Sequence, residues 1–399
     1  MKRILSAPSL LAVGLTMSFP MCEARGEAGK TAQEHRWSHW PSEEFFPLAV
    51  WLQNPSNAER YRKAGFNTFV ALWKGPTDEQ LTALKRAGMH VICEQNAVAL
   101  QHLEDPTIIG WMHGDEPDNA QEIPGKGGYG PPITPEKMVE DYQRMRKADP
   151  SRPVLLNLGQ GVAWNEWYGR GVRSRHPEDY PRYLEGCDIV SFDIYPAVHD
   201  SPEVAGKLWF VGQGVERLVR WSEGKRVVWN CLECTRIGNV NRKPTPKEVR
   251  CEAWMSLVHG SKGLIYFLHQ FKPTFREAAL LDDPEMLEAI GSLNRQITAL
   301  APVLASTKEP SATVASENVS VPIAIRSKHL DNATYLFAVA MRGESTVGTF
   351  RFKNMTGEAK VEVLGENRSI EAQDGFFEDQ FAAWDVHLYR MQTTEAGRH

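Results

Sequence analysis

The sequence lacks the features of several common functional classes. Its 45 lysines and arginines against 50 aspartates and glutamates give a net charge of −5, and the two signs are interspersed along the chain. Because phosphate binding needs a basic face, nucleic acid is not an expected partner. The apolar segment near the N-terminus, residues 10–19, is shorter than the roughly 20 residues that a membrane span needs. These absences favour a neutral ligand.

Two chemical signatures are also missing. The first long apolar run, residues 46–53, is followed by Asn54 and Pro55 rather than by a glycine-rich loop, which argues against a nucleotide-binding doubly wound sheet. The same run carries no His-x-His pair, which a metal-dependent hydrolase barrel usually has there. We therefore expect neither a cofactor nor a metal ion.

Cysteine is scarce and forms no evident framework. Of six cysteines, five follow residue 28, an odd number without the spacing of a disulfide scaffold. Cys231 and Cys234 are expected on one strand, where their spacing points them to opposite sides, and no second pair completes a zinc site. Buried free thiols are the expectation.

Residues 1–28 have the pattern of an export signal. Two basic residues precede the apolar stretch, and small residues follow near Ala24 and Ala28. We expect a secreted or periplasmic protein without a membrane span. Lipid attachment at Cys22 is the alternative, although the preceding Phe-Pro-Met lacks the small residues such a site usually has.

Eight short apolar runs, each followed by a polar and often helix-patterned stretch, predict an α/β fold, a (β/α)8 TIM barrel over residues 40–302. Helix start signals such as Thr77 and Thr245 support the alternation. The runs are 46–53, 66–73, 90–96, 108–116, 153–161, 188–196, 227–235 and 263–271, and the helical patterns include 77–87, 135–147, 212–222, 245–259 and 284–300.

After Pro302 the apolar residues alternate with period two, which is typical of antiparallel strands. We expect a small C-terminal antiparallel β-sandwich domain over 303–392 that caps the barrel, and a flexible tail at 393–399. The expected strands are 319–326, 334–340, 347–352, 359–364 and 386–391.

Two of the apolar runs end in a glutamate beside turn residues. Glu116 ends the fourth run and Glu233 the seventh. Side chains at the carboxyl ends of barrel strands meet at one mouth, where active sites lie. Hydrolysis of a glycosidic bond with retention needs two carboxyl groups about 5–5.5 Å apart. The two glutamates are therefore candidate catalytic residues.

These features resemble the large clan of retaining glycoside hydrolases whose barrel carries the acid/base glutamate after strand four and the nucleophile glutamate after strand seven. The resemblance covers 46–300, and 250–267 is similar to the stretch before the last strand in β-galactosidase-like members. It implies that Glu116 is the acid/base and Glu233 the nucleophile of a secreted enzyme. Such an enzyme cleaves β-glycosidic bonds in an oligo- or polysaccharide by double displacement.

Two positions depart from the clan's pattern. Asp115 stands where the clan usually has an asparagine that contacts the sugar 2-hydroxyl. A carboxylate accepts that hydrogen bond but cannot donate one as an amide does. The clan's frequent tryptophan at the end of strand eight is replaced by His-Gln-Phe at 269–271.

Substrate contacts are expected from strand ends, where aromatic faces stack on sugars and polar groups bind hydroxyls. Tyr195, after the sixth run, is the candidate to hydrogen-bond Glu233. The further candidates are Asp115, Trp51, Trp73, Asn157, Trp164, His269 and Gln270.

Several alternatives stay open. The same scaffold suits a non-catalytic carbohydrate-binding protein, and a carboxyl separation of about 6.5–9.5 Å would indicate an inverting hydrolase. Glu116 is alternatively a solvated loop carboxylate, and Glu233 a structural residue paired with Arg236. Asp193 is alternatively inward-facing and structural, and Tyr195 a core residue.

Overall fold

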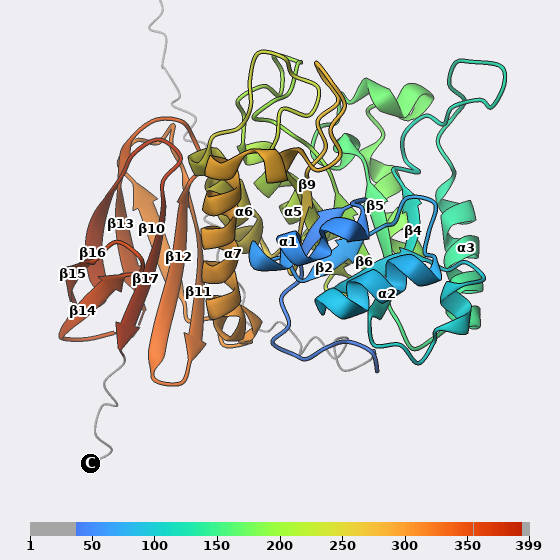
Figure 1. Ribbon diagram of the computed structural model, residues 1–399. Coiled ribbons are helices and arrows are strands. Elements are labelled where there is room, and N and C mark those ends of the chain that lie inside the picture. Colours follow the sequence, from blue (N-terminus) through green and yellow to red (C-terminus); the bar gives the residue numbers. More distant parts are fainter. Residues whose placement is uncertain (1–36, 354, 393–399) are drawn as a thin grey trace, which may run out of the picture.

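The computed structural model describes residues 37–353 and 355–392. The expected export signal at 1–28 and the tail at 393–399 lie outside these residues. The described chain forms a parallel β/α barrel with a C-terminal antiparallel β domain beside it (Figure 1). Both parts of this predicted fold class are confirmed. None of the described helices is long and apolar enough to cross a membrane.

The barrel strands form one parallel sheet in the order β7-β6-β5-β4-β3-β2-β1-β9-β8. The seventh barrel position is split at Trp229, so that β7 pairs with β6 and β8 pairs with β9. Each of the eight predicted runs contains its strand. The strands are β1 Leu48–Trp51, β2 Thr68–Val70, β3 His90–Glu94, β4 Ile108–Asp115, β5 Val154–Leu158, β6 Ile189–Phe192, β7 Val227–Val228, β8 Asn230–Glu233 and β9 Leu264–Phe267.

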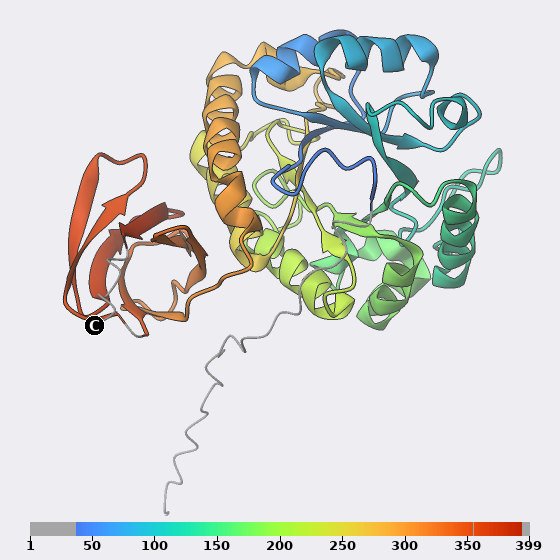
Figure 2. The ribbon, with the colours of Figure 1, turned by 90° about the horizontal axis from the view of Figure 1, so that it is seen from below.

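Helices cover the outside of the sheet, as Figure 2 shows from below. Their start signals work as expected: Thr77 and Thr245 each form a capping box with the residue three positions on. The last helix continues through Pro302, beyond the expected boundary. The helices are α1 Ala58–Lys63, α2 Asp78–Ala87, α3 Pro135–Ala148, α4 Tyr180–Tyr183, α5 Trp209–Ser222, α6 Pro246–His259 and α7 Pro284–Ala305.

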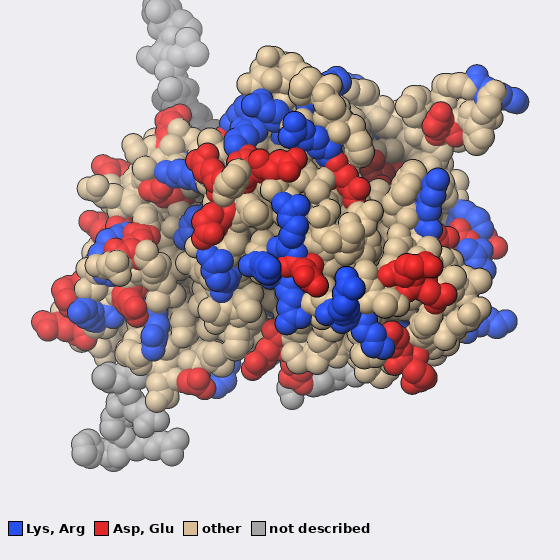
Figure 3. All heavy atoms as spheres, viewed as in Figure 1, with Lys and Arg blue, Asp and Glu red and all other residues tan. Residues whose placement is uncertain are grey.

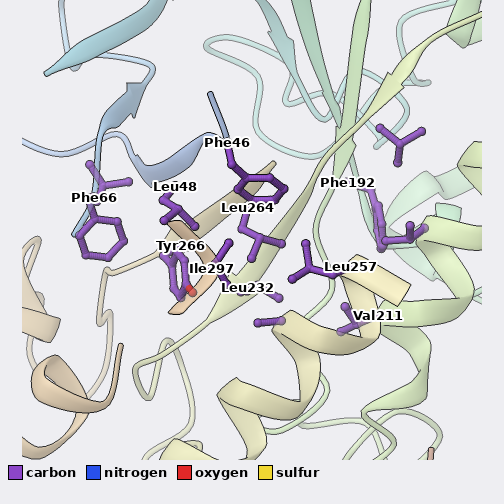
Figure 4. Close-up of a cluster of buried hydrophobic side chains, with 14 of the residues drawn as sticks. Phe46, Leu48, Phe66, Phe192, Val211, Leu232, Leu257, Leu264, Tyr266 and Ile297 are labelled. Atoms are coloured by element: carbon purple, nitrogen blue, oxygen red, sulfur yellow. The ribbon is translucent and has the colours of Figure 1, made fainter. Parts of the chain in front are cut away.

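The strands are buried on both faces, as parallel sheets require. One core lies inside the barrel and includes Val70, Leu155 and Ile265. A second core lies between the strands and the surrounding helices, where Leu232 and Leu264 meet helix residues (Figure 4). Alternation along each strand therefore decides which residues face the inside of the barrel.

The N-terminal described segment closes the lower end of the barrel. Figure 2 shows this blue segment lying across the barrel's amino-terminal end. Trp37 is almost fully buried in the interior core, and its ring lies 5.4 Å from that of Trp40, which lies 6.3 Å from Trp229. Trp37 and Trp40 therefore pack as part of the barrel's interior core.

The C-terminal domain is one eight-stranded antiparallel sheet in the order β10-β13-β16-β15-β14-β17-β12-β11, curled around its own core. Phe350 and Phe377 stack in that core at 4.9 Å. The strands are β10 Ala312–Ser316, β11 Ile323–Leu330, β12 Ala333–Ala340, β13 Thr346–Phe352, β14 Glu358–Val363, β15 Arg368–Gln373, β16 Phe376–Phe381 and β17 Val386–Gln392.

Helix α6 joins the barrel to this domain. Trp254 of α6 is fully buried with its ring 5.1 Å from Phe337 of β12. The Cys251 thiol lies 3.8 Å from the carbonyl oxygen of Ala340. The helix is thus covered by the barrel on one side and by the C-terminal domain on the other.

The five described cysteines are buried and free. Cys231 belongs to the core inside the barrel, whereas Cys234 belongs to the core between strands and helices. The two thiols therefore point to opposite sides, as their spacing predicted.

Candidate active site

The turn after β4 carries Glu116 to the barrel mouth. Glu116 has φ 45°, in the left-handed region, which is uncommon for a residue with a side chain and concentrates at functional sites. Its amide donates to the carbonyl of Asn157 at 2.9 Å, and its own carbonyl accepts from the Asn119 amide at 3.0 Å. These bonds fix the direction of the half-buried Glu116 side chain.

Asp118 holds this turn from below. Its carboxyl is fully buried and accepts from the Gly159 amide at 2.8 Å and from the Tyr180 hydroxyl at 2.9 Å. The Arg170 guanidinium lies 4.0 Å away and also donates to the Asp118 carbonyl. These interactions satisfy the Asp118 carboxyl and stabilise the turn that carries Glu116.

The carboxyl next to Glu116 is that of Asp193, which follows β6. Glu116 and Tyr195 both hydrogen-bond the Asp193 side chain. Apart from the carboxyl pair itself, its buried Oδ1 atom has no hydrogen-bond partner among the described residues. A buried oxygen of this kind is uncommon, and at a barrel mouth it marks a place for a ligand.

The carboxyls of Glu116 and Asp193 share one proton at intermediate pH. Burial, then the charge and the hydrogen bond of Asp193, raise the pKa of Glu116 well above its usual value. Burial raises the pKa of Asp193 to about 7, while hydrogen bonds from Glu116 and Tyr195 act in the opposite direction. Glu116 therefore keeps its proton longest and Asp193 ionises first, which are the protonation states of a general acid and a carboxylate base or nucleophile.

A line of hydrogen bonds supports the mouth from inside the barrel. The Ser191 hydroxyl donates to Asn157 Oδ1 at 2.7 Å, and Asn157 Nδ2 donates to Asp115 Oδ1 at 3.0 Å. Asn157 is buried, whereas Asp115 is exposed. Of these two predicted substrate contacts, the exposed Asp115 is accessible to a ligand, and the buried Asn157 orients the Asp115 carboxyl.

Glu233 lies in a different environment. It is fully buried, and its oxygens accept from the amides of Ala197 at 2.5 Å and Val198 at 2.9 Å, in the loop after β6. The Glu252 carboxyl of α6 hydrogen-bonds it. Burial raises the pKa of both glutamates, that of Glu233 to about 8.

The structure thus brings Glu116 together with Asp193, not with Glu233. Tyr195 hydrogen-bonds Asp193 rather than its predicted partner Glu233. Arg236, the expected structural partner of Glu233, instead donates to the carbonyl of Val240. The nucleophile role of Glu233 stays a prediction.

The remaining predicted contacts differ in how far their side chains are buried. Trp51 is buried in the interior core, and Trp164 packs at 5.9 Å on Trp167. Trp73 is 68% exposed after β2. His269 is buried beside Gln53, and Gln270 lies in a hairpin where its side chain donates to the Thr274 carbonyl at 3.2 Å.

Asp193 is the functional candidate that the sequence did not favour. The alternation of Ile189, Ser191, Asp193 and Tyr195 places all four on the inner face of the sixth strand and its extension, which is the signal that identifies it. Over residues 37–353 and 355–392, no three or more His, Cys, Asp or Glu side chains are grouped to hold a metal ion.

No protein-family model matches this chain, and no curated protein matches it. Solved structures match it over most of its length. An α-amylase from Geobacillus thermoleovorans, complexed with acarbose, has a TM-score of 0.53 at 10% identity, covering 88% of this chain and 99% of that one. α-Galactosidase I from Mortierella vinacea has a TM-score of 0.53 at 9% identity, covering 89% and 98%. An Anoxybacillus α-amylase has a TM-score of 0.52 at 8% identity, covering 90% and 100%.

At these identities the likeness shows the fold alone. The chain has a TIM-barrel fold followed by an antiparallel β domain, and these solved structures match that fold.

Proposed function

We propose that the protein is a secreted retaining glycoside hydrolase that acts on β-linked oligo- or polysaccharides. Glu116 is its acid/base, and Asp193 is the carboxylate that faces the anomeric carbon. One observation carries the proposal: a proton-holding carboxyl and a more acidic carboxyl meet at a barrel mouth. This is the complementary pair that glycosidic bond cleavage needs.

The chemistry balances with these two groups. Glu116 transfers its proton to the glycosidic oxygen while an Asp193 oxygen bonds to the anomeric carbon, so that the leaving sugar departs as an alcohol and a glycosyl ester remains. Glu116, now ionised, takes a proton from water, which attacks the same carbon and releases Asp193. Tyr195 donates a hydrogen bond to Asp193 and keeps the carboxyl oriented.

Retention is favoured by the contact between the carboxyls. An inverting enzyme holds its carboxyls about 6.5–9.5 Å apart to admit a water molecule, whereas a retaining enzyme needs about 5–5.5 Å. Two carboxyls in contact are nearer to the shorter spacing than to the longer one. The β linkage and the export of the protein rest on the sequence resemblance and on residues 1–28.

A neutral saccharide also fits the surface. Figure 3 shows acidic and basic side chains interspersed over the barrel and the C-terminal domain. This face offers no single-sign field to a charged polymer.

The test is sugar release from a panel of polysaccharides and of aryl α- and β-glycosides. Wild type is compared with Glu116→Gln and Asp193→Asn, and Glu371→Gln is the matched control, since Glu371 is an exposed glutamate of β15 in the C-terminal domain. We expect each site variant to lose about 10²–10⁴-fold in rate and the control to keep wild-type activity.

The nucleophile is identified by rescue. Azide should restore turnover of an activated aryl glycoside to Asp193→Gly, giving a glycosyl azide, and should not restore it to Glu233→Ala. Rescue of Glu233→Ala alone would return the nucleophile to Glu233. Saccharide binding without any release would favour the non-catalytic carbohydrate-binding protein.

A further inference from the structure

An aromatic hairpin follows β9 at the barrel mouth. Phe271 is 50% exposed and Phe275 is 60% exposed, and their rings lie 5.9 Å apart. Both rings also lie 6.1 Å from that of His269, at interplanar angles of 8° and 26°. The hairpin thus presents to solvent two apolar rings, each stacked on His269.

The hairpin is held firmly in this position. Gln270 and Arg276 exchange backbone hydrogen bonds of 2.9 and 2.8 Å at its base, and the Phe271 amide donates to the Ile237 carbonyl at 2.6 Å. The Gln53 side chain, after β1, donates to the Glu277 carbonyl at 3.0 Å. The exposed rings are therefore supported from two neighbouring loops.

The aromatic row continues inward to the carboxyl pair. The Phe267 ring lies 5.0 Å from His269, and the Tyr195 ring lies 5.3 Å from Phe267. Tyr195 in turn hydrogen-bonds Asp193. An unbroken series of rings thus connects Asp193 with the exposed Phe275, and we call it the β9 row.

A second row of aromatic rings begins near Glu116, on the loop after β5. Tyr168 is 72% exposed, with its ring 4.7 Å from that of Trp167. The Trp167 indole donates a hydrogen bond to Asn119 Oδ1 at 2.8 Å, and the backbone amide of Asn119 donates one to the Glu116 carbonyl. We call Trp167 and Tyr168 the β5 row.

We propose that the two rows are sugar-stacking sites on either side of the carboxyl pair, so that the protein binds an extended neutral saccharide and cleaves it internally. The inference rests on the proposed function. The two rows begin at different members of the pair, and the loops that carry them are separated around the barrel by β6, β7 and β8. Exposed aromatic faces continuous with a reactive centre suit the apolar faces of pyranose rings, and an uncharged ligand suits the interspersed surface charge.

The experiment measures how binding and turnover depend on saccharide length. Affinities of Glu116→Gln for cello-, xylo-, manno- and galacto-oligosaccharides of two to six units are determined by calorimetry. The same is done after adding Phe271→Ala with Phe275→Ala, or Tyr168→Ala. Phe376→Ala is the matched control, because Phe376 is a 39% exposed phenylalanine of the C-terminal domain.

We expect affinity to rise with length in the parent and to fall about tenfold for the longest oligosaccharides when either row is truncated. In the active background, the same variants should lower kcat/KM for the polymer and leave it unchanged for an aryl monosaccharide. Early products should be a mixture of oligosaccharides.

The outcomes separate this inference from the proposed function. Length-dependent binding that the row variants weaken, without hydrolysis by wild type, would support the rows and overturn the enzyme. Hydrolysis that is unaffected by the row variants, or that releases monosaccharides alone, would overturn the rows and leave the enzyme. Binding of no oligosaccharide by any form would also overturn the rows.

Discussion

Replacing Glu233 distinguishes the sequence-based mechanism from the one that the geometry favours. A nucleophile at the mouth can be truncated with little loss of stability. Glu233 instead fills a fully buried position between the amides of Ala197 and Val198 and the carboxyl of Glu252. The geometry therefore predicts that Glu233→Ala is primarily a stability mutation.

The magnitude follows from the groups left behind. Glu233→Ala strands two amides and the buried carboxyl of Glu252, at about 1–3 kcal/mol for each unsatisfied group. Together these groups amount to about 3–9 kcal/mol of the free energy of unfolding, to which the cavity adds. Glu233→Gln keeps the volume and one acceptor oxygen, so its loss should be about 1–3 kcal/mol.

The assay is urea unfolding followed by tryptophan fluorescence and circular dichroism, run beside turnover of the best substrate from the panel. Asp193→Asn is the comparison, because it should lose turnover while unfolding near the wild-type midpoint. A Glu233→Ala protein within about 1 kcal/mol of wild type, inactive and rescued by azide, would refute the reasoning and support the nucleophile role.

Three further predictions use the same contacts. Turnover should rise with pH through about 7 as Asp193 ionises and fall at higher pH as Glu116 loses its proton; a flat rate profile would contradict this assignment. Gly159→Ala should lower kcat with little change in the melting temperature, because its Cβ would lie 2.8 and 2.9 Å from the Asn119 amide group and 3.0 Å from Glu116 Oε1. Unchanged kinetics would show that the side chains of the Glu116 turn tolerate displacement. Burial raises the pKa of Glu233 from 4.5 to about 8, so the stability that the Glu233–Glu252 pair contributes is complete below pH 4.5 and is lost as pH rises toward 8. In thermal melts, the melting temperature of Glu252→Gln should therefore fall less steeply with pH than that of wild type.

The barrel was predictable because every one of its strands is buried on two faces. Each apolar run therefore contrasts with the polar helix surface that follows, and the order of the elements can be read from the sequence. In the C-terminal domain the same approach missed β10, β15 and β16. Arg368 and Asp379, which pair at 2.7 Å, take inward positions in β15 and β16 and interrupt the apolar alternation there.

The candidate site was predictable in part. Glu116 follows a strand and a turn, so its place at the mouth comes from local sequence. Whether Glu233 meets a ligand depends on contacts with the loop after β6 and with α6, which the sequence near Glu233 does not contain. Asp193 was overlooked because one aspartate after an apolar run has the same local pattern whether it supports the core or faces a ligand.

The two-sided burial of α6 bears on how this protein can be divided. Through the contact of Trp254 with Phe337, the core around the barrel continues across α6 into the C-terminal domain. Removing the C-terminal domain would expose apolar residues of α6 to solvent. The chain should therefore melt as one cooperative unit, and a fusion or domain exchange that keeps α6 with only one of its neighbours should yield an aggregation-prone fragment.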